Sequence, residues 1–133
     1  MAKPAGPTNV SRVLIVDDEQ GMRELVKKCL TDARFKLIEA AGGDEALAIA
    51  GNPRELDLLI TDELMPGMEG HELSRRLRAL NPDLKVLYLT GHSDHLFDAK
   101  HQMWEREAYL DKPFNVQSLR QAVDLLMVGR ITL

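Results

Sequence analysis

The sequence predicts an α/β fold in which a parallel sheet carries helices on both faces. Two observations predict it. Short apolar runs alternate five times with stretches in which apolar residues recur every three or four positions, which is the pattern of strands followed by helices. The apolar runs are also nearly continuous, as is typical of parallel strands that are buried on both faces. We therefore expect a doubly wound sheet of five strands and five helices.

The first two strand-helix units follow a short N-terminal lead. Residues 12–16 form a β-branched apolar run, and the helix expected over 22–30 has its apolar residues at helical spacing. Residues 35–40 again have the composition of a strand. A Gly-Gly-Asp sequence at 42–44 opens the second helix, and Gly-Asn-Pro at 51–53 ends it.

The remaining three units repeat this order. Breaker-rich sequences separate their elements, such as Met-Pro-Gly at 65–67 and Asn-Pro at 81–82. The expected strands and helices are, in chain order, a strand at 56–61, a helix around 73–80, a strand at 84–89, a helix at 94–104, a strand at 108–110 and a helix at 116–127.

Length and composition narrow the class of protein. With 133 residues, 44% of them hydrophobic, the chain is long enough for one domain with its own core. A formal net charge of -4 with scattered arginines argues against a nucleic-acid surface, which needs a basic patch. No apolar run is long enough to span a membrane, and residues 1–10 lack the apolar stretch of a secretory signal. We therefore expect a cytoplasmic protein that binds neither nucleic acid nor membrane.

Polar side chains follow four of the predicted strands, at the point where each strand ends. They are Asp17 and Asp18, Asp62, Thr90, and Lys112. Because the carboxyl ends of parallel strands meet at one edge of a sheet, and ligands collect there, we expect these side chains to converge. The sequence therefore predicts three carboxylates, a hydroxyl and an ammonium group at one edge.

This combination favours a magnesium site with phosphoryl chemistry. Neighbouring carboxylates such as Asp17 and Asp18 repel one another, and a cation offsets that repulsion. Carboxylate oxygens are the ligands that Mg²⁺ takes, usually with several waters. A carboxylate in such a site can also be the nucleophile towards a phosphoryl group and form an aspartyl-phosphate. Asp62, which stands alone at the central strand, is our candidate.

Four motifs in this order resemble the receiver domain of two-component response regulators. They are DD at 17–18, TDELMPGMEG at 61–70, LTG at 89–91 and YLDKPF at 109–114. The resemblance covers about residues 11–128 and implies a flavodoxin-like strand order, 2-1-3-4-5. Residues 1–10 are then a flexible lead and residues 129–133 a C-terminal tail.

The resemblance implies roles for the residues around the phosphoacceptor. Asp62 would accept phosphate from a histidine kinase or a phosphotransfer protein. Mg²⁺ would be bound by Asp18 and Asp62 directly, by the backbone carbonyl of Leu64, and by Asp17 through a water. Lys112 would pair with a phosphoryl oxygen.

The resemblance also implies a conformational switch. Thr90 would hydrogen-bond a phosphoryl oxygen, and Tyr109 would rotate inward. The resemblance implies that the Lys112-Pro113 peptide bond is cis, and only an X-Pro bond makes the cis form inexpensive. The face formed by the fourth helix, fifth strand and fifth helix would then bind a downstream protein. We expect a monomer or a weak phosphorylation-dependent dimer, which catalyses only its own phosphorylation and dephosphorylation and is otherwise no enzyme.

The chain departs from the family pattern in two places. Glu63 and Leu64, the two residues after the phosphoacceptor, are unlike the commonest choices and bear on the lifetime of the phosphoryl group. An acidic Glu63 could reach towards the metal. Residues 105–106 are Glu-Arg, where relatives often have Gly-Ala, so the end of the fourth helix is expected to differ.

Simpler interpretations apply to several other residues. The three arginines within 75–78 are expected to form a solvated helix face, and Cys29 to pack in the core. The three histidines within 92–101 lack the spacing of a zinc site. Trp104 is a possible anchor for a partner protein.

Two other classes of protein remain as alternatives. A Mg²⁺-dependent phosphatase of the haloacid dehalogenase type also has an Asp nucleophile on a parallel sheet, but it needs a second Asp where this chain has Leu64. A phosphate-independent interaction module would keep the fold and lose the switch. The intact set of acids, threonine and lysine at the strand ends argues against that module.

Overall fold

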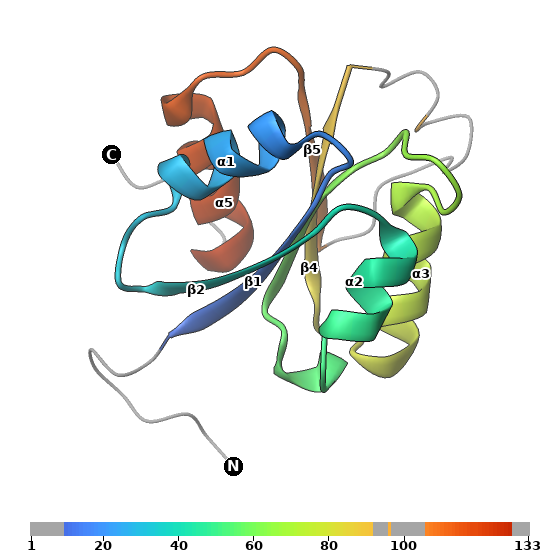
Figure 1. Cartoon of the computed structure of the whole chain (residues 1–133). Helices are drawn as coiled ribbons and strands as arrows, with labels where there is room; N and C mark the ends of the chain where they lie inside the picture. The colour runs from blue at the N-terminus through green and yellow to red at the C-terminus, as the bar shows by residue number, and fades with distance from the viewer. Residues whose placement is uncertain (1–9, 92–95, 97–105, 129–133) are drawn as a thin grey trace.

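The computed structural model describes residues 10–91, 96 and 106–128, and it contains a five-stranded parallel sheet between two layers of helices (Figure 1). The strand order is β2-β1-β3-β4-β5, and all neighbouring strands are parallel. This confirms the predicted fold class and order. The strands are β1 Ser11–Val16, β2 Phe35–Ala40, β3 Leu58–Asp62, β4 Lys85–Thr90 and β5 Glu107–Asp111.

The helices cover the sheet in pairs. α1 (Gln20–Cys29) and α5 (Val116–Val128) lie on one face, and α2 (Gly43–Ile49) and α3 (Gly70–Leu80) lie on the other (Figure 1). The described residues thus contain four of the five predicted helices. The helix predicted at 94–104 lies outside the described residues apart from Leu96, which is fully buried.

The boundaries of the third and fifth strands differ from the prediction. β3 begins at Leu58, because a short 3-10 helix (Pro53–Glu55) precedes it, with the Asn52 side chain accepting a hydrogen bond from the backbone of Arg54 at 3.1 Å. β5 is longer than predicted. Its polar ends, Glu107 and Asp111, pair in register with β4, so backbone pairing extends beyond the apolar residues that marked the strand.

Two apolar layers, one on each side of the sheet, make up the core. Successive residues of a strand point to opposite faces, so Leu14 packs under α2 and α3, whereas Val13 packs under α1 and α5. Cys29 lies in the second layer and is 3% exposed, which confirms its packing role. Burial on both faces explains why the strands have no polar alternation.

The prediction of a solvated arginine face on α3 holds for two of its three residues. Arg75 and Arg76 are exposed and form ion pairs with Glu72. It is wrong for Arg78, whose side chain is 12% exposed and lies 3.2 Å from a carboxylate oxygen of Glu107 on β5. Residue 78 follows residue 74 by four positions, so both lie on the helix face that points towards the sheet.

The buried Glu107 carboxylate ties α3 to β4 and β5. It accepts hydrogen bonds from the Ser74 hydroxyl at 3.4 Å and the Tyr88 hydroxyl at 3.3 Å. Burial, together with the charges of Glu107 and Glu63, raises the pKa of Tyr88 well above its usual value. A buried carboxylate is stable only where it is paired and hydrogen-bonded, and Arg78 supplies the pairing.

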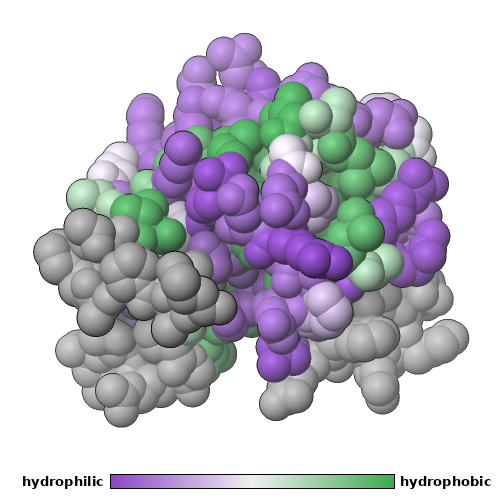
Figure 2. All heavy atoms as spheres, turned by 90° about the horizontal axis from the view of Figure 1, so that it is seen from below, coloured by the Kyte–Doolittle hydropathy of each residue, from purple (hydrophilic) through white to green (hydrophobic). Residues whose placement is uncertain are grey.

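The two ends of the sheet differ in character. Polar side chains that could bind a ligand or react gather at the carboxyl ends of the strands. The opposite end, seen from below in Figure 2, has a band of apolar surface within a polar surround. Ile49 and Leu80, the last residues of α2 and α3, are exposed apolar side chains.

In the described part of the chain, no helix is long and apolar enough to cross a membrane.

Candidate functional site

The carboxyl ends of β1, β3 and β5 bring two acids and a lysine into contact. The Lys112 ammonium nitrogen lies 3.3 Å from Asp17 Oδ2 and 3.5 Å from Asp62 Oδ2. Asp18 joins this cluster, since one carboxylate oxygen each of Asp17, Asp18 and Asp62 lies within 4.8 Å of the others. Three residues that are 45 or more positions apart along the chain thus meet at one edge, as parallel strand ends require.

Asp17 is held rigidly. Its side chain is buried, and its Oδ1 accepts a hydrogen bond from the backbone of Glu19 at 2.9 Å. Its backbone carbonyl accepts a second from Arg23 Nη1 at 2.7 Å. These bonds leave Oδ2 turned towards Lys112. Arg23 was not predicted, because its role depends on a carbonyl that only the folded β1–α1 turn presents to it.

Asp62 is the second buried acid of the site. Its removal from water raises the pKa of this carboxyl, the Lys112 ammonium lowers it, and the neighbouring Asp17 charge raises it again, so that the net direction is upward. The ionised form of Asp62 is therefore under-stabilised by the protein alone. A divalent cation between these carboxylates would relieve that cost.

The chemistry of the donors fits Mg²⁺. All three candidate side-chain ligands are carboxylates, and Mg²⁺ takes oxygen ligands from one or two carboxylates while it keeps several waters. Asp18 is exposed, so the site is open to solvent.

Thr90 and Lys112 are joined through the backbone. Thr90 ends β4, is fully buried, and its carbonyl accepts a hydrogen bond from the Lys112 N–H at 2.9 Å. The Lys112-Pro113 peptide bond is cis, which confirms that prediction. Tyr109 lies on β5 and is 41% exposed.

The β3–α3 loop, which contains Leu64, folds back against Asp62. The Gly70 N–H donates to the Glu63 carbonyl at 2.9 Å. A Cβ at position 70 would lie only 2.3 Å from the Asp62 carbonyl oxygen, so only glycine permits this approach. Gly67, at the tip of the loop, has a φ of +82°, a conformation that glycine adopts without strain.

Glu63 does not reach towards the strand-end acids, so the expectation that it could do so is wrong. Its carboxylate is fully buried and accepts a hydrogen bond from the His71 N–H at 2.8 Å, and it contacts His71 Nδ1 at 2.6 Å. Neighbouring residues at a strand end point to opposite faces, which turns Glu63 away from Asp62. The unusual acid directly after Asp62 was the sequence signal for this contact.

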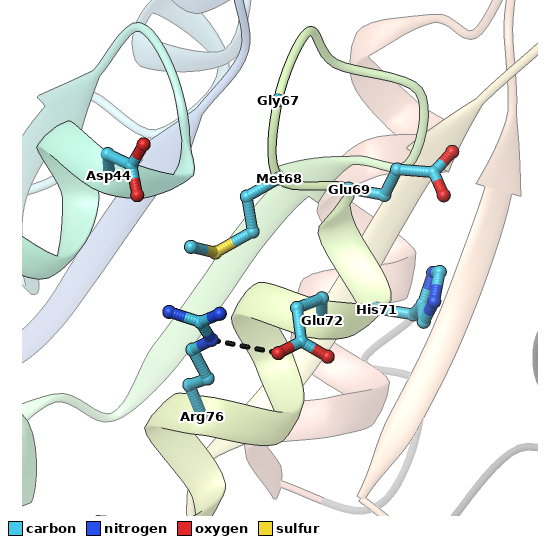
Figure 3. A pocket seen from close by; sticks show the side chains of 7 residues that line it. All are labelled: Asp44, Gly67, Met68, Glu69, His71, Glu72 and Arg76. Atoms are coloured by element: carbon cyan, nitrogen blue, oxygen red, sulfur yellow. Dashed lines mark hydrogen bonds and ion pairs between the residues drawn. The ribbon is translucent and has the colours of Figure 1, made fainter.

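A shallow pocket lies beside the same loop, between the starts of α2 and α3 (Figure 3). Its volume is about 380 Å³. The lining residues are Asp44, Gly67, Met68, Glu69, His71, Glu72 and Arg76. The pocket does not include Asp62, so it is a neighbour of the strand-end site.

The remaining predictions concern the histidines at 92, 95 and 101, Trp104, and the Glu-Arg pair at 105–106. Positions 92, 95, 101, 104 and 105 lie outside the described residues. Arg106 is exposed and lies 3.8 Å from Asp83 in an ion pair.

Five parallel strands in this order, with acids, a threonine and a cis Lys-Pro bond at their ends, define a receiver-type α/β domain. Residues 13–124 match the family described as the response regulator receiver domain. The chain belongs to this family, the receiver domains of two-component response regulators.

Curated relatives include both short receivers and longer proteins. The chain is 28% identical over 120 residues to the response regulator receiver protein CpdR of Brucella abortus, covering 90% of this chain and 99% of that protein. It is 29% identical over 112 residues to sporulation initiation phosphotransferase F of Bacillus subtilis, covering 84% and 90%. It is 33% identical over 112 residues to the sensor kinase CckA of Brucella abortus, of which it spans only 12%.

Solved structures agree with this placement. The response regulator TrrA of Thermotoga maritima, crystallised in complex with Mg²⁺-BeF, is 35% identical, with a TM-score of 0.72 over 88% of this chain and 99% of that one. A receiver domain protein from Clostridium thermocellum is 27% identical, with a TM-score of 0.76 over 90% and 96%.

Proposed function

We propose that this chain is a phosphorylation-dependent receiver in which Asp62 accepts a phosphoryl group from a histidine kinase or a phosphotransfer protein. One observation carries the proposal. The Lys112 ammonium lies between the carboxylates of Asp17 and Asp62, at 3.3 and 3.5 Å, with Asp18 beside them. This arrangement provides a nucleophile, a cation for the phosphoryl oxygens and the ligands of a metal ion at one strand edge.

The transfer step follows from these positions. A carboxylate oxygen of Asp62 attacks phosphorus, the bond from phosphorus to the donor breaks, and the donor keeps the bonding electron pair. Lys112 pairs with a phosphoryl oxygen. Asp18, Asp62 and the carbonyl of Leu64 would hold Mg²⁺ directly and Asp17 would hold it through a water, and the ion would neutralise further charge on the phosphoryl oxygens. Support for the metal comes from the donor set and from the Mg²⁺-BeF complex of the relative TrrA.

Thr90 and Tyr109 form the proposed switch. Thr90 is buried at the end of β4, and Tyr109 is 41% exposed on the adjacent strand β5. A hydrogen bond from the Thr90 hydroxyl to a phosphoryl oxygen, with inward rotation of Tyr109, would favour one of two states. A protein partner that binds near β5 and α5 would read this change.

The proposal also assigns the reaction to the receiver itself. The protein acts on its own aspartate and turns over no external substrate. The main rival is a phosphatase with an Asp nucleophile, which needs a second aspartate two residues later. This chain lacks that aspartate, because Leu64 occupies the position. A phosphate-independent module would have no need for a buried acid between a lysine and two further carboxylates.

Intact mass after incubation with Mg²⁺ and acetyl phosphate tests the proposal. We expect one added phosphoryl group in the wild-type chain and none in Asp62→Asn or with a chelator. Asp83→Asn, which changes an exposed aspartate far along the chain, is the matched control and should behave as wild type.

Two results would contradict the proposal. A phosphoryl group on Asp62→Asn would show that the acceptor is another residue. Release of many equivalents of phosphate from a simple ester would instead favour the phosphatase.

A further inference from the structure

The strongest unassigned feature is a second group of ligand-type side chains at the two ends of the β3–α3 loop. Glu63, Glu69 and His71 each offer one ligand atom, and these atoms lie within 4.8 Å of one another. None of the three belongs to the strand-end cluster of Asp17, Asp18 and Asp62.

We propose that Glu63, Glu69 and His71 form a second metal site that takes a borderline divalent transition ion such as Zn²⁺. The inference goes beyond the proposed phosphoryl chemistry and does not depend on it. Two carboxylates and an imidazole are a ligand set that zinc accepts, with the open position filled by water.

The spacing of the ligand atoms suits such an ion. Glu63 Oε2 and His71 Nδ1 lie 2.6 Å apart, and the whole group lies within 4.8 Å. Zinc bonds of about 2.0–2.1 Å in tetrahedral geometry place ligand atoms roughly 3.3 Å apart. The Glu63 and His71 atoms would therefore move apart to take up the ion, and the upper limit of 4.8 Å for the group is compatible with that value.

The surroundings orient the ligands. Glu63 Oε1 accepts a hydrogen bond from the His71 N–H at 2.8 Å, and Oε2 lies 2.6 Å from His71 Nδ1, so a bound ion would take the place of the contact between these two atoms. The Glu63 carbonyl is held by the Gly70 N–H at 2.9 Å. Hydrogen bonds of this kind around a ligand fix its direction and strengthen metal binding.

The site is accessible from one side. Glu63 is fully buried, whereas the His71 side chain is 27% exposed. Figure 3 shows Glu69 and His71 extending to the same side at the start of α3, away from Asp44 and Arg76. An ion would thus enter from solvent and meet a buried carboxylate behind the imidazole.

The ligand types distinguish the two sites. The strand-end cluster has carboxylates alone and suits Mg²⁺. The imidazole of His71 makes the second group suited to a transition ion, since nitrogen ligands favour Zn²⁺ over Mg²⁺.

Calorimetric titration of Zn²⁺ into the full chain, in excess Mg²⁺, tests the proposal, with Co²⁺ absorption as the spectroscopic readout. We expect one Zn²⁺ per chain, with affinity at least about tenfold lower in Glu69→Gln and in His71→Gln. Glu72→Gln, an acid of the same helix outside the group, is the matched control and should bind as wild type. Asp18→Asn and Asp62→Asn should also keep the zinc site.

Three outcomes would overturn it. They are no Zn²⁺ binding, loss of binding in Asp18→Asn, and unchanged binding in both Glu69→Gln and His71→Gln. His92→Gln and His95→Gln serve as further controls, because loss of binding in either with His71→Gln unaffected would assign the ion to other histidines. Circular dichroism of each variant separates loss of ligand from loss of fold.

Discussion

Lys112 is the residue on which the charge balance of the strand-end site depends most, because its ammonium group contacts two buried carboxylates. The positions of Asp17, Asp62 and Lys112 could be predicted from the sequence, since each follows an apolar run that marks a strand. The direction of Glu63 could not, because one residue of difference at a strand end reverses the face to which a side chain points. The partner of Arg23 likewise exists only in the folded chain.

Asp62→Asn is expected to stabilise the metal-free protein at neutral pH. Burial raises the pKa of Asp62 in the folded state, above the unfolded value of about 3.9. Below that pH the Asp62 carboxyl is protonated in both the folded and the unfolded chain, so its burial carries no cost for a buried charge. As the pH rises, the unfolded chain ionises first, and the wild-type protein loses stability until the folded pKa is passed.

Denaturant unfolding with a chelator present, from acid to neutral pH, measures this effect. We expect the free energy of unfolding of Asp62→Asn to exceed that of wild type at neutral pH. The difference should shrink as the pH falls. A variant less stable than wild type at neutral pH would contradict the burial argument.

At the scale of elements, the β3–α3 loop connects the central strand to both ligand groups. Its conformation depends on the close approach of Gly70 to Asp62. The strands and most helices could be predicted from periodicity, because burial on both faces leaves a continuous apolar pattern. The inward turn of Arg78 could not be predicted from the charges on its helix, because Glu107 lies on a strand 29 positions further along.

Gly70→Ala should destabilise the protein and weaken Mg²⁺ binding. The new methyl group would lie 2.3 Å from the Asp62 carbonyl oxygen, so the loop must move, at a cost of about 1–3 kcal/mol. Gly21→Ala is the control, because nothing lies within 4 Å of a Cβ there, and alanine favours the helix by about 0.5–1 kcal/mol. Thermal unfolding and Mg²⁺ titration of both variants check this. Equal stability of the two would show that the loop yields freely.

At the scale of the whole molecule, folding concentrates negative charge at one edge of the sheet. The net charge is -4, and three of the carboxylates share one strand edge with a single described lysine. Folding therefore brings together charges that the unfolded chain keeps apart. A bound cation should then stabilise the folded state by mass action.

Mg²⁺ is expected to raise the free energy of unfolding by about 2.7 kcal/mol when its concentration is one hundred times the dissociation constant. Asp18→Asn should lose most of this gain, because it removes an exposed ligand without disturbing the core. Glu24→Gln, an exposed acid of α1, should keep it. Thermal unfolding against Mg²⁺ concentration measures the effect, and an equal gain in all three proteins would place the ion elsewhere.

The hydrogen bond from the Lys112 N–H to the Thr90 carbonyl has a consequence for motion. It extends the pairing of β4 and β5 by one step beyond Asp111, so the main chains at Thr90 and Lys112 move as one unit. Any independent adjustment of the hydroxyl and the ammonium must come from side-chain torsions. Such torsions are fast in exposed side chains, but Thr90 is fully buried and the Lys112 side chain is only 18% exposed, so the Thr90 hydroxyl can reorient only when the side chains packed around it move.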